Sequence, residues 1–324
     1  MSQSLQSVTI KNPQGMSVTS LNYGARLTSV QVPVAGAPTE MLLGYQNPTE
    51  YLTDPFYMGA VCGRVCNRIS NACFEQNGQR YKLDNNHGEH CLHGGSGGFS
   101  QQFWQLQQQT EQQVTYGLVS PHLDQGFPGQ LSVTVSYSLD NNNRLSIEMQ
   151  AKAEQITPVN LTHHAYFNLG QSSCMDLMLA VHSAGFLATD AQGIPTGQVR
   201  PLSVLGADLS GSTGVANHWQ TGTYQRIQEE QGLDHCFIMQ DNLQQRPQAL
   251  LLAKRTGVEL RLYSNQPAMQ IYAGKFLASP FAPYQGICLE AQGYTDALNQ
   301  TEFPSILLEP DQLYQHKTVL EFST

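Results

Sequence analysis

Strict alternation of apolar and polar residues is the feature that most constrains how this chain can fold. Residues 131–139 read Leu-Ser-Val-Thr-Val-Ser-Tyr-Ser-Leu without a break, and residues 144–150 repeat the pattern after a turn-forming run at 140–143. Successive side chains of a β-strand point to opposite faces, so this alternation is typical of strands with one buried face. The two segments predict a β-hairpin.

Similar short segments occur along much of the chain. Clusters of glycine, proline and asparagine lie between them and predict turns and loops. No amphipathic helical pattern of about ten or more residues stands out. The sequence therefore predicts an all-β fold, an antiparallel sandwich or barrel. Further strands are expected at 17–21, 29–34, 114–119, 177–182, 258–263, 269–272 and 318–322.

The chain of 324 residues is long enough for one large or two ordinary domains. No shift in composition marks a linker, so a single domain over residues 1–324 is predicted. The glutamine-rich stretch 101–113 contains Phe103, Trp104 and Leu106 and runs into a predicted strand. We therefore interpret it as an ordered surface strand rather than as low-complexity sequence.

Charge and composition exclude several classes of protein. Sixteen basic residues stand against 25 acidic ones, giving a formal net charge of −9, which disfavours binding to nucleic acid or to anionic membranes. No apolar stretch approaches the roughly 18 residues that span a bilayer, and the N-terminus lacks the pattern of a secretory signal. A cytoplasmic protein is expected. Its seven cysteines are an odd number spread through a long chain and predict free thiols.

Histidines gather in three segments, at 87–93, at 163–164 and at 235. A metal site was weighed for the first segment, because three histidines and nearby cysteines are ligands that zinc accepts. A spacing of three residues brings ligands together only on a helix, and the glycines of this segment predict a loop. No bound metal is therefore expected. The histidines in question are His87, His90 and His93, with Cys62, Cys66 or Cys91 beside them.

Two other kinds of chemistry are disfavoured by the motifs that are missing. The sequence contains no Gly-x-Ser-x-Gly nucleophile elbow, and Ser96 in Gly-Gly-Ser-Gly-Gly is interpreted as part of a turn. The same glycines lack the strand-then-helix setting and the Lys-Ser/Thr ending of a phosphate-binding loop. A serine hydrolase and a nucleotide enzyme are both disfavoured.

Eight motifs follow one another in order along the chain. They are GRVCNRI at 63–69, LHGG at 92–95, DQGFPG at 124–129, PVNLTHHAYFNL at 158–169, IPTG at 194–197, LDH at 233–235, MQIY at 269–272 and CLEAQ at 288–292. Together they resemble those of the aldose 1-epimerase (galactose mutarotase) family, and the resemblance extends over about residues 17–322. It implies a large antiparallel β-sandwich with few short helices, whose concave face holds a free monosaccharide such as galactose or glucose. It also implies interconversion of the α and β anomers without a cofactor.

The implied reaction opens a cyclic hemiacetal, so one group must take the proton of the anomeric hydroxyl while another protonates the ring oxygen. A carboxylate and a histidine suit these roles near neutral pH. The family resemblance assigns Glu290 as the base, His164 as the acid and His93 as a donor near the ring oxygen. Base and acid are expected on opposite sides of the C1–O5 unit.

The strand pattern gives independent information on Glu290 and on His163. Alternation over residues 286–292 places Glu290 and Cys288 on the face opposite Ile287 and Leu289, which favours a position facing a cavity. His163 is expected to point away from His164 and to take no part in catalysis.

The resemblance also implies four residues that bind the sugar hydroxyls. Arginine offers a fork of donors, and a carboxylate accepts from two hydroxyls at once. Structural roles were weighed as well, an ion pair at the end of the sandwich for Arg68 and a loop cap for Asp234. Tyr166 or Trp104 could offer a ring face to the sugar, although packing in the core is expected for both. The four binding residues are Asn67, Arg68, Asp234 and Gln270.

Several departures from the family pattern leave the preferred sugar open. Cys66 replaces a common alanine, His163 a common asparagine, and Tyr294-Thr-Asp296 a commoner aromatic-Pro-Asp turn. One alternative function is a hexose-6-phosphate 1-epimerase, which needs a cationic pocket, yet only Arg64 and Arg68 lie beside the motifs. Another is a non-catalytic sugar-binding module, against which both Glu290 and His164 argue. A monomer or homodimer is expected.

Overall fold

The predicted hairpin is part of a large antiparallel sheet. We describe residues 4–205, 209, 212–218, 223–240 and 246–324 of a computed structural model. Strands β12 (Leu131–Leu139) and β13 (Arg144–Ala153) pair in the register Leu131↔Ala153 to Leu139↔Leu145. Their residues alternate between buried and accessible positions, as the sequence pattern predicts.

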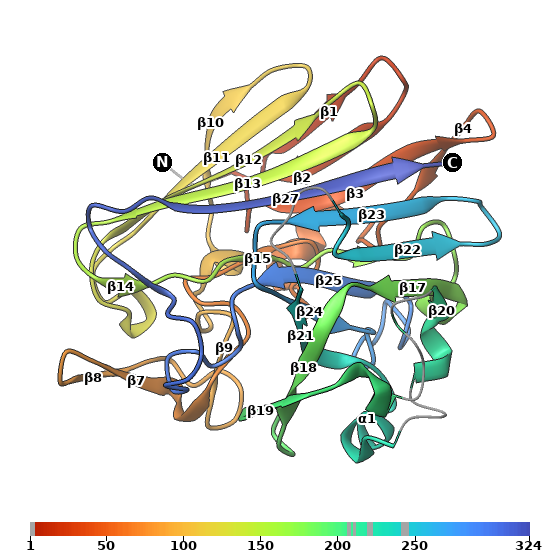
Figure 1. Ribbon diagram of the computed structural model, residues 1–324. Helices are drawn as coiled ribbons and strands as arrows, with labels where there is room; N and C mark the ends of the chain where they lie inside the picture. Colours follow the sequence, from red (N-terminus) through yellow and green to blue (C-terminus); the bar gives the residue numbers. More distant parts are fainter. Residues whose placement is uncertain (1–3, 206–208, 210–211, 219–222, 241–245) are drawn as a thin grey trace.

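Nine described strands form this sheet, in the order β10-β11-β12-β13-β27-β23-β22-β17-β20. The strand β27, which comes last in the chain, lies in its middle, between β13 and β23 (Figure 1). The members other than the hairpin are β10 (Gln105–Gln109), β11 (Gln113–Ser120), β27 (Tyr314–Ser323), β23 (Glu259–Ser264), β22 (Ala249–Ala253), β17 (Leu177–Val181) and β20 (Thr213–Gly214).

A second sheet of six described strands lies against the first, in the order β16-β25-β24-β21-β18-β19. Figure 1 shows β27, β23 and β22 in one layer, with β25, β24 and β21 below them. The six strands are β16 (Tyr166–Phe167), β25 (Ile287–Gln292), β24 (Ala268–Tyr272), β21 (Asp234–Met239), β18 (Ser183–Thr189) and β19 (Pro195–Arg200).

Smaller elements complete the described fold. Four strands near the N-terminus pair in the order β1-β2-β3-β4, and four two-stranded ladders join the loops. One short α-helix and seven 3-10 helices are present among the described residues. The strands are β1 (Ser7–Lys11), β2 (Ser17–Leu21), β3 (Arg26–Val34), β4 (Ala37–Glu40), β5 (Val61–Cys62), β6 (Arg68–Ile69), β7 (Cys73–Gln76), β8 (Gln79–Lys82), β9 (Cys91–Leu92), β14 (Thr157–Pro158), β15 (Thr162–His163) and β26 (Leu307–Leu308). The helices are η1 (Pro48–Thr53), η2 (Ser70–Ala72), η3 (Phe99–Gln101), η4 (Asp124–Gly126), η5 (Cys174–Asp176), η6 (Leu202–Leu205), η7 (Val215–His218) and α1 (Gln225–Glu230).

The main hydrophobic core fills the space between the two large sheets. Met149 and Leu320 of the nine-stranded sheet belong to the same buried cluster as Ile271 and Leu289 of the six-stranded sheet. Burial of one such side chain is worth about 1.5–3 kcal/mol, so this interface is a large source of stability. One face of the six-stranded sheet therefore packs against the nine-stranded sheet. The cavity described below lies on its other face.

These observations confirm the prediction of an all-β antiparallel sandwich with few short helices. The glutamine-rich stretch is only partly a strand: β10 occupies residues 105–109, while Trp104 is buried in the core. The sequence analysis did not predict β1, β18, β21 or β22. The run Ala-Leu-Leu-Leu-Ala of β22 lacks alternation, so its periodicity gave no strand signal.

Among the described residues, no helix has the length and apolar character needed to cross a membrane.

Candidate active site

A cavity of about 780 Å³ lies on the face of the six-stranded sheet that points away from the core. Residues that face each other across this sheet bring their side chains to it. Gln270 of β24 pairs with Glu290 of β25 and with Cys236 of β21, whereas the neighbouring Leu289 and Ile271 point into the core. The alternation predicted for residues 286–292 is therefore present. The cavity brings together all seven residues predicted for the site: Asn67, Arg68, His93, His164, Asp234, Gln270 and Glu290.

Glu290 is the most deeply buried acid of the cavity, with 2 % of its surface exposed. Burial raises its pKa well above the usual value, and the nearby charge of Asp234 raises it further, while Arg68 opposes the shift. Its Oε2 atom has no hydrogen-bond partner among the described residues. Buried polar atoms are nearly always paired, so this oxygen is suited to receive a hydrogen bond from a ligand hydroxyl.

His164 lies beside Glu290, with its Nε2 atom 3.7 Å from Oε1 of the carboxylate. Burial lowers the pKa of the imidazole from its ordinary value to about 4. On the other side of the ring, Nδ1 is 3.5 Å from Sγ of Cys288. A separation of 3.7 Å leaves no room for a whole pyranose between the two groups, whereas their placement on opposite sides of the C1–O5 unit stays a prediction. The two groups stand side by side at one end of the cavity.

His93 completes a group of three, and a backbone N–H of another residue fixes which of its ring nitrogens carries a proton. The backbone N–H of Asn67 donates to its Nδ1 at 3.3 Å. Burial and the neighbouring His164 keep its pKa well below the usual value, so the ring is neutral. A neutral imidazole whose Nδ1 accepts must carry its proton on Nε2. His93 is therefore a hydrogen-bond donor through Nε2.

The loop that presents His93 depends on the glycine that follows it. Gly94 has φ +87°, in the left-handed region, and a β-carbon there would overlap the carbonyl oxygen of Gly63. This explains in physical terms the Leu-His-Gly-Gly motif of the sequence. The ring of His93 packs edge-on against that of His164, with 5.2 Å between the ring centroids.

The predicted binding residues form a connected network beside the three acid–base groups. Arg68 Nη2 lies 3.6 Å from Asp234 Oδ2, and Gln270 Nε2 donates to Asp234 Oδ1 at 2.6 Å. Asn67 Oδ1 accepts from the backbone N–H of Arg68 at 2.8 Å. Guanidinium, carboxylate and amide are thus held in fixed directions toward the cavity, which is what recognition of several hydroxyls requires.

Aromatic rings line the wall of the cavity. Tyr166 packs against His164 at 5.1 Å between centroids, and Tyr57 packs against His93 at 4.5 Å. Tyr166 is 2 % exposed and donates to the backbone carbonyl of Phe56, so it is both packed and part of the wall. Trp104 lies in the core, as expected. Tyr57 and Tyr272 were not predicted, because tyrosine has many structural uses.

Arg64, His90 and His163, which lie in or beside the sequence motifs, have structural roles. Arg64 is buried and donates to the backbone carbonyls of Pro128 and Gly129, both at 2.8 Å, outside the cavity. His90 accepts from the backbone N–H of Asn71 and contacts Gln192. His163 lies between the sheets beside Tyr137, away from the cavity, as expected.

The structure places a possible group of metal ligands at other residues than the sequence suggested. His87, His90 and His93 do not gather into a ligand group among the described residues. His93, His164 and Glu290 do, with their ligand atoms all within 4.8 Å of one another. Two histidines and a carboxylate are a donor set that a divalent transition metal accepts. The spacing of histidines along the sequence could not reveal this, since the three residues come from distant segments.

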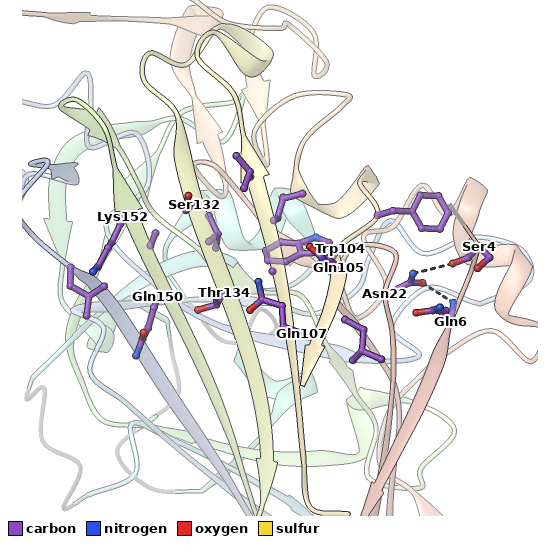
Figure 2. Close-up of a pocket in the computed structure, with 18 residues that line it drawn as sticks. Ser4, Gln6, Asn22, Trp104, Gln105, Gln107, Ser132, Thr134, Gln150 and Lys152 are labelled. Carbon is purple, nitrogen blue, oxygen red and sulfur yellow. Dashed lines mark hydrogen bonds between the residues drawn. The ribbon is translucent and has the colours of Figure 1, made fainter. Parts of the chain in front are cut away.

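A second, larger cavity of about 980 Å³ lies on the nine-stranded sheet near the N-terminal strands. Figure 2 shows Gln107 of β10 together with Thr134 of β12 and Gln150 of β13, and the last two residues pair across their strands. The amide of Gln107 occupies the space over Gly117, where a β-carbon would overlap it. Lys152 is the one ionisable residue among its described lining residues. This cavity offers no acid–base pair.

Comparison with known proteins agrees with this arrangement. The family model for aldose 1-epimerase matches residues 6–321. The chain is 34 % identical over 315 residues to a galactose mutarotase of Sus scrofa, covering 94 % of this chain and 90 % of that protein. It is 33 % identical over 328 residues to an aldose 1-epimerase of Escherichia coli K12, covering 97 % and 94 %.

Solved structures give the same result. A homologue of aldose epimerase from C. elegans superposes with a TM-score of 0.93 at 26 % identity, covering 99 % of both chains. A galactose 1-epimerase from Lactobacillus acidophilus gives 0.86 at 25 % identity, again over 99 % of both chains. From its sequence, its fold and the residues gathered in its cavity, the chain belongs to the aldose 1-epimerase family.

Proposed function

We propose that this isomerase interconverts the α and β anomers of free hexoses, galactose and glucose, by opening and reclosing the pyranose ring. One observation carries the proposal: the buried carboxylate of Glu290 and the imidazole of His164 lie 3.7 Å apart, beside a network of hydroxyl-binding groups. A carboxylate beside a histidine is the pair that a concerted proton exchange requires.

Ring opening uses two oxygens that are bonded to the same carbon, C1. Glu290 takes the proton of the anomeric hydroxyl, and the imidazolium of His164 gives its Nε2 proton to the ring oxygen as the C1–O5 bond breaks. The product is an open-chain aldehyde. Rotation about C1–C2 turns its other face to O5, and the two proton transfers then run in reverse. The anomeric hydroxyl and the ring oxygen are neighbours on C1, so two catalytic groups that lie side by side, Glu290 and His164, can each reach one of them.

The pair needs one proton between its two members. Burial raises the pKa of Glu290 and lowers that of His164, so the uncharged pair, Glu-COOH beside neutral imidazole, is favoured in the free site. Moving this proton to His164 gives the ion pair that opens the ring, with no change in total charge. Such a pair titrates as a unit. The pair holds one proton before ring opening and one before ring closure once the transfers run in reverse, so no proton is exchanged with solvent.

His93 and the binding network support this step. The Nε2–H of His93 donates near the ring oxygen and stabilises the charge that develops there. Asp234 and Arg68 hold hydroxyls on the far side of the sugar, and Gln270 and Asn67 keep these two groups in place.

Two alternatives are disfavoured by the cavity itself. A 6-phosphate substrate needs free cations, but Arg68 pairs with Asp234 and Arg226 pairs with Glu229 at 2.9 Å. Lys275 is a third cation among the lining residues, and the comparison with a hexose 6-phosphate described below tests whether it binds a phosphate. A pure binding module needs no acid–base pair, yet Glu290 and His164 are both buried there at the energetic cost of desolvation.

Polarimetry of freshly dissolved α-galactose tests the proposal. The protein should speed the approach to equilibrium, and glucose, xylose and a hexose 6-phosphate should be compared with it under the same conditions. Equal rates with and without protein for every sugar would leave a binding module. Fastest turnover of the 6-phosphate would favour the phosphate-specific alternative.

We also propose that catalysis needs no metal, because both steps are proton transfers that the side chains complete. Exhaustive chelation should leave kcat unchanged, whereas added zinc should inhibit by binding His93, His164 and Glu290 in competition with sugar. Loss of activity on chelation, restored by a stoichiometric metal, would contradict this proposal.

A further inference from the structure

The hairpin turn between β18 and β19 forms part of the wall of the cavity. Its residues Gln192 and Gly193 line the cavity together with Arg68 and Asp234, yet neither takes part in the proton transfers described above. The turn comes directly before the Ile-Pro-Thr-Gly motif of residues 194–197, which has no role in those transfers either. The contacts of the turn lead to Arg68, one of the residues that bind sugar hydroxyls in the proposed function.

The side chain of Asp190 fixes the shape of this turn. Its Oδ1 accepts from the backbone N–H groups of Gln192 at 2.8 Å and of Ile194 at 3.0 Å. The backbone N–H of Gly193 donates to the carbonyl of Asp190 at 3.1 Å. An aspartate that accepts from the backbone two residues further on stabilises a turn. Gly193 is held there at φ +78°, in the left-handed region that favours glycine.

A side-chain contact ties the turn to a second segment of the cavity wall. His90 is buried, and its Nδ1 accepts from the backbone N–H of Asn71 at 3.1 Å. A ring whose Nδ1 accepts carries its proton on Nε2, and this atom lies 2.9 Å from Oε1 of Gln192 and donates to it. The turn is thus held at two points, by Asp190 within it and by His90 from the loop before β9.

Gly193 lies against the guanidinium group of Arg68. A β-carbon at Gly193 would be 3.0 Å from Cζ of that group and 3.2 Å from both Nε and Nη1. Because Cζ, the centre of the planar group, is the nearest atom, the missing side chain would lie over its face. Carbon atoms in good contact are about 3.5–4.0 Å apart, so a methyl group here would push the guanidinium away. Nη2 of the same group faces Asp234 Oδ2 at 3.6 Å.

We propose that Gly193 is a positioning residue for Arg68, and that the turn fixes the direction in which the guanidinium meets the sugar. This inference rests on the proposed function. A free arginine side chain has many rotamers, and ordering it when a ligand binds reduces affinity. The turn over its face and Asp234 at its end hold the group before the sugar arrives. A side chain at position 193 would displace the guanidinium and weaken sugar binding, whereas the acid–base pair would be left as it is.

The experiment compares Gly193→Ala with Gly257→Ala as a matched control. Gly257 lies between β22 and β23, outside the cavity, with φ +75°, and apart from its chain neighbours no atom lies within 4 Å of a β-carbon placed there. Both substitutions therefore strain the backbone alike, but only one of them meets Arg68. Polarimetry gives kcat and KM for galactose, and isothermal titration calorimetry gives the Kd. Thermal unfolding shows that each variant is folded.

Gly193→Ala should raise KM and Kd for galactose roughly three- to tenfold, the effect of one weakened hydrogen bond, and keep kcat within about twofold of wild type. Gly257→Ala should leave all three constants unchanged while losing thermal stability to a similar extent. If Gly193→Ala does not fold, Gly193→Asn takes its place, since asparagine tolerates the left-handed region and carries the same β-carbon.

A double variant shows whether the effect passes through Arg68. Lysine has no planar group at this point, so in an Arg68→Lys background Gly193→Ala should have little further effect on Kd. Equal effects in both backgrounds, or equal constants for Gly193→Ala and Gly257→Ala, would overturn the positioning role and leave the proposed function intact. Galactose binding that Gly193→Ala weakens, without any turnover by the wild type, would overturn the proposed function alone. Absence of both binding and turnover would overturn both.

Discussion

The two large cavities of this protein differ in what their walls can do. The cavity on the nine-stranded sheet is the larger, at about 980 Å³ against 780 Å³, and amides, hydroxyls and one lysine line it (Figure 2). The cavity on the six-stranded sheet has amides and hydroxyl-binding groups too, but it also buries Glu290 beside His164. Size and polarity therefore do not identify the site of chemistry.

The two cavities differ in whether they bury titratable groups. Desolvation moves the pKa of Glu290 up and that of His164 down, so burial favours the uncharged form of both groups, which share one proton. Lys152 of the larger cavity lies on an exposed strand position and has no acid facing it among the described lining residues. Four experiments test this contrast.

The largest effect should come from the acid–base pair. Glu290→Gln and His164→Asn keep the size of each side chain but remove a proton acceptor or donor, so each should lower kcat about 10²- to 10⁴-fold. Polarimetry on galactose measures the loss. Glu148→Gln on the surface of β13 is the matched control and should retain activity. Near-normal kcat in either site variant would remove that residue from the mechanism.

The pH profile should show a bell with an acid limb well below the solution pKa of histidine. Below the lower pKa of the pair, both groups are protonated and no base remains; above the upper pKa, both are deprotonated and no acid remains. Burial lowers the pKa of His164 to about 4 and raises that of Glu290. The acid limb of kcat/KM should therefore lie near pH 4. A limb near pH 6.5 would show that His164 is well solvated in the free enzyme.

An intermediate effect is expected at the binding network. Asp234→Asn removes the charge that faces Arg68 and weakens the charged hydrogen bonds to sugar hydroxyls, so kcat/KM should fall roughly ten- to 100-fold, mostly through KM. Asp311→Asn on the exposed loop before β27 is the control. A loss confined to kcat would mean that Asp234 acts on the reacting atoms instead.

The smallest effect should come from the larger cavity. Gln107→Ala and Thr134→Ala alter its amide and hydroxyl groups, and surface changes of this kind alter stability by no more than about 0.5 kcal/mol. Both should leave kcat/KM for galactose within about twofold of wild type. A strong loss in either would show that the two cavities are coupled, and the contrast drawn above would fail.

The alternation of apolar and polar residues predicted several of the strands and the side of β25 that faces the cavity. Alternation gave β12 and β13 correctly and placed Glu290 on the cavity side of β25, since the period of a strand is short and regular. It did not give β22, whose residues are apolar throughout. The single domain over 1–324 and the monomeric or dimeric state stay predictions.

The rest of the site depends on distances that no local pattern contains. The sequence motifs named His93, His164 and Glu290 but contain no information on the distance between them; their adjacency follows from how distant strands pack. Tyr272 lies within the MQIY motif but was given no role there, and Tyr57 lies in no motif; their place in the cavity wall arises from how separate segments of the chain meet. The ring tautomer of His93 likewise follows from one backbone contact with Asn67.

The central position of β27 has a consequence for how the molecule is made. On a ribosome this strand emerges after all the others described, yet it joins β13 to β23. Until then the nine-stranded sheet exists as two halves, each with an open edge that can pair with other chains. Completion of the sandwich thus waits for the last strand to be synthesised.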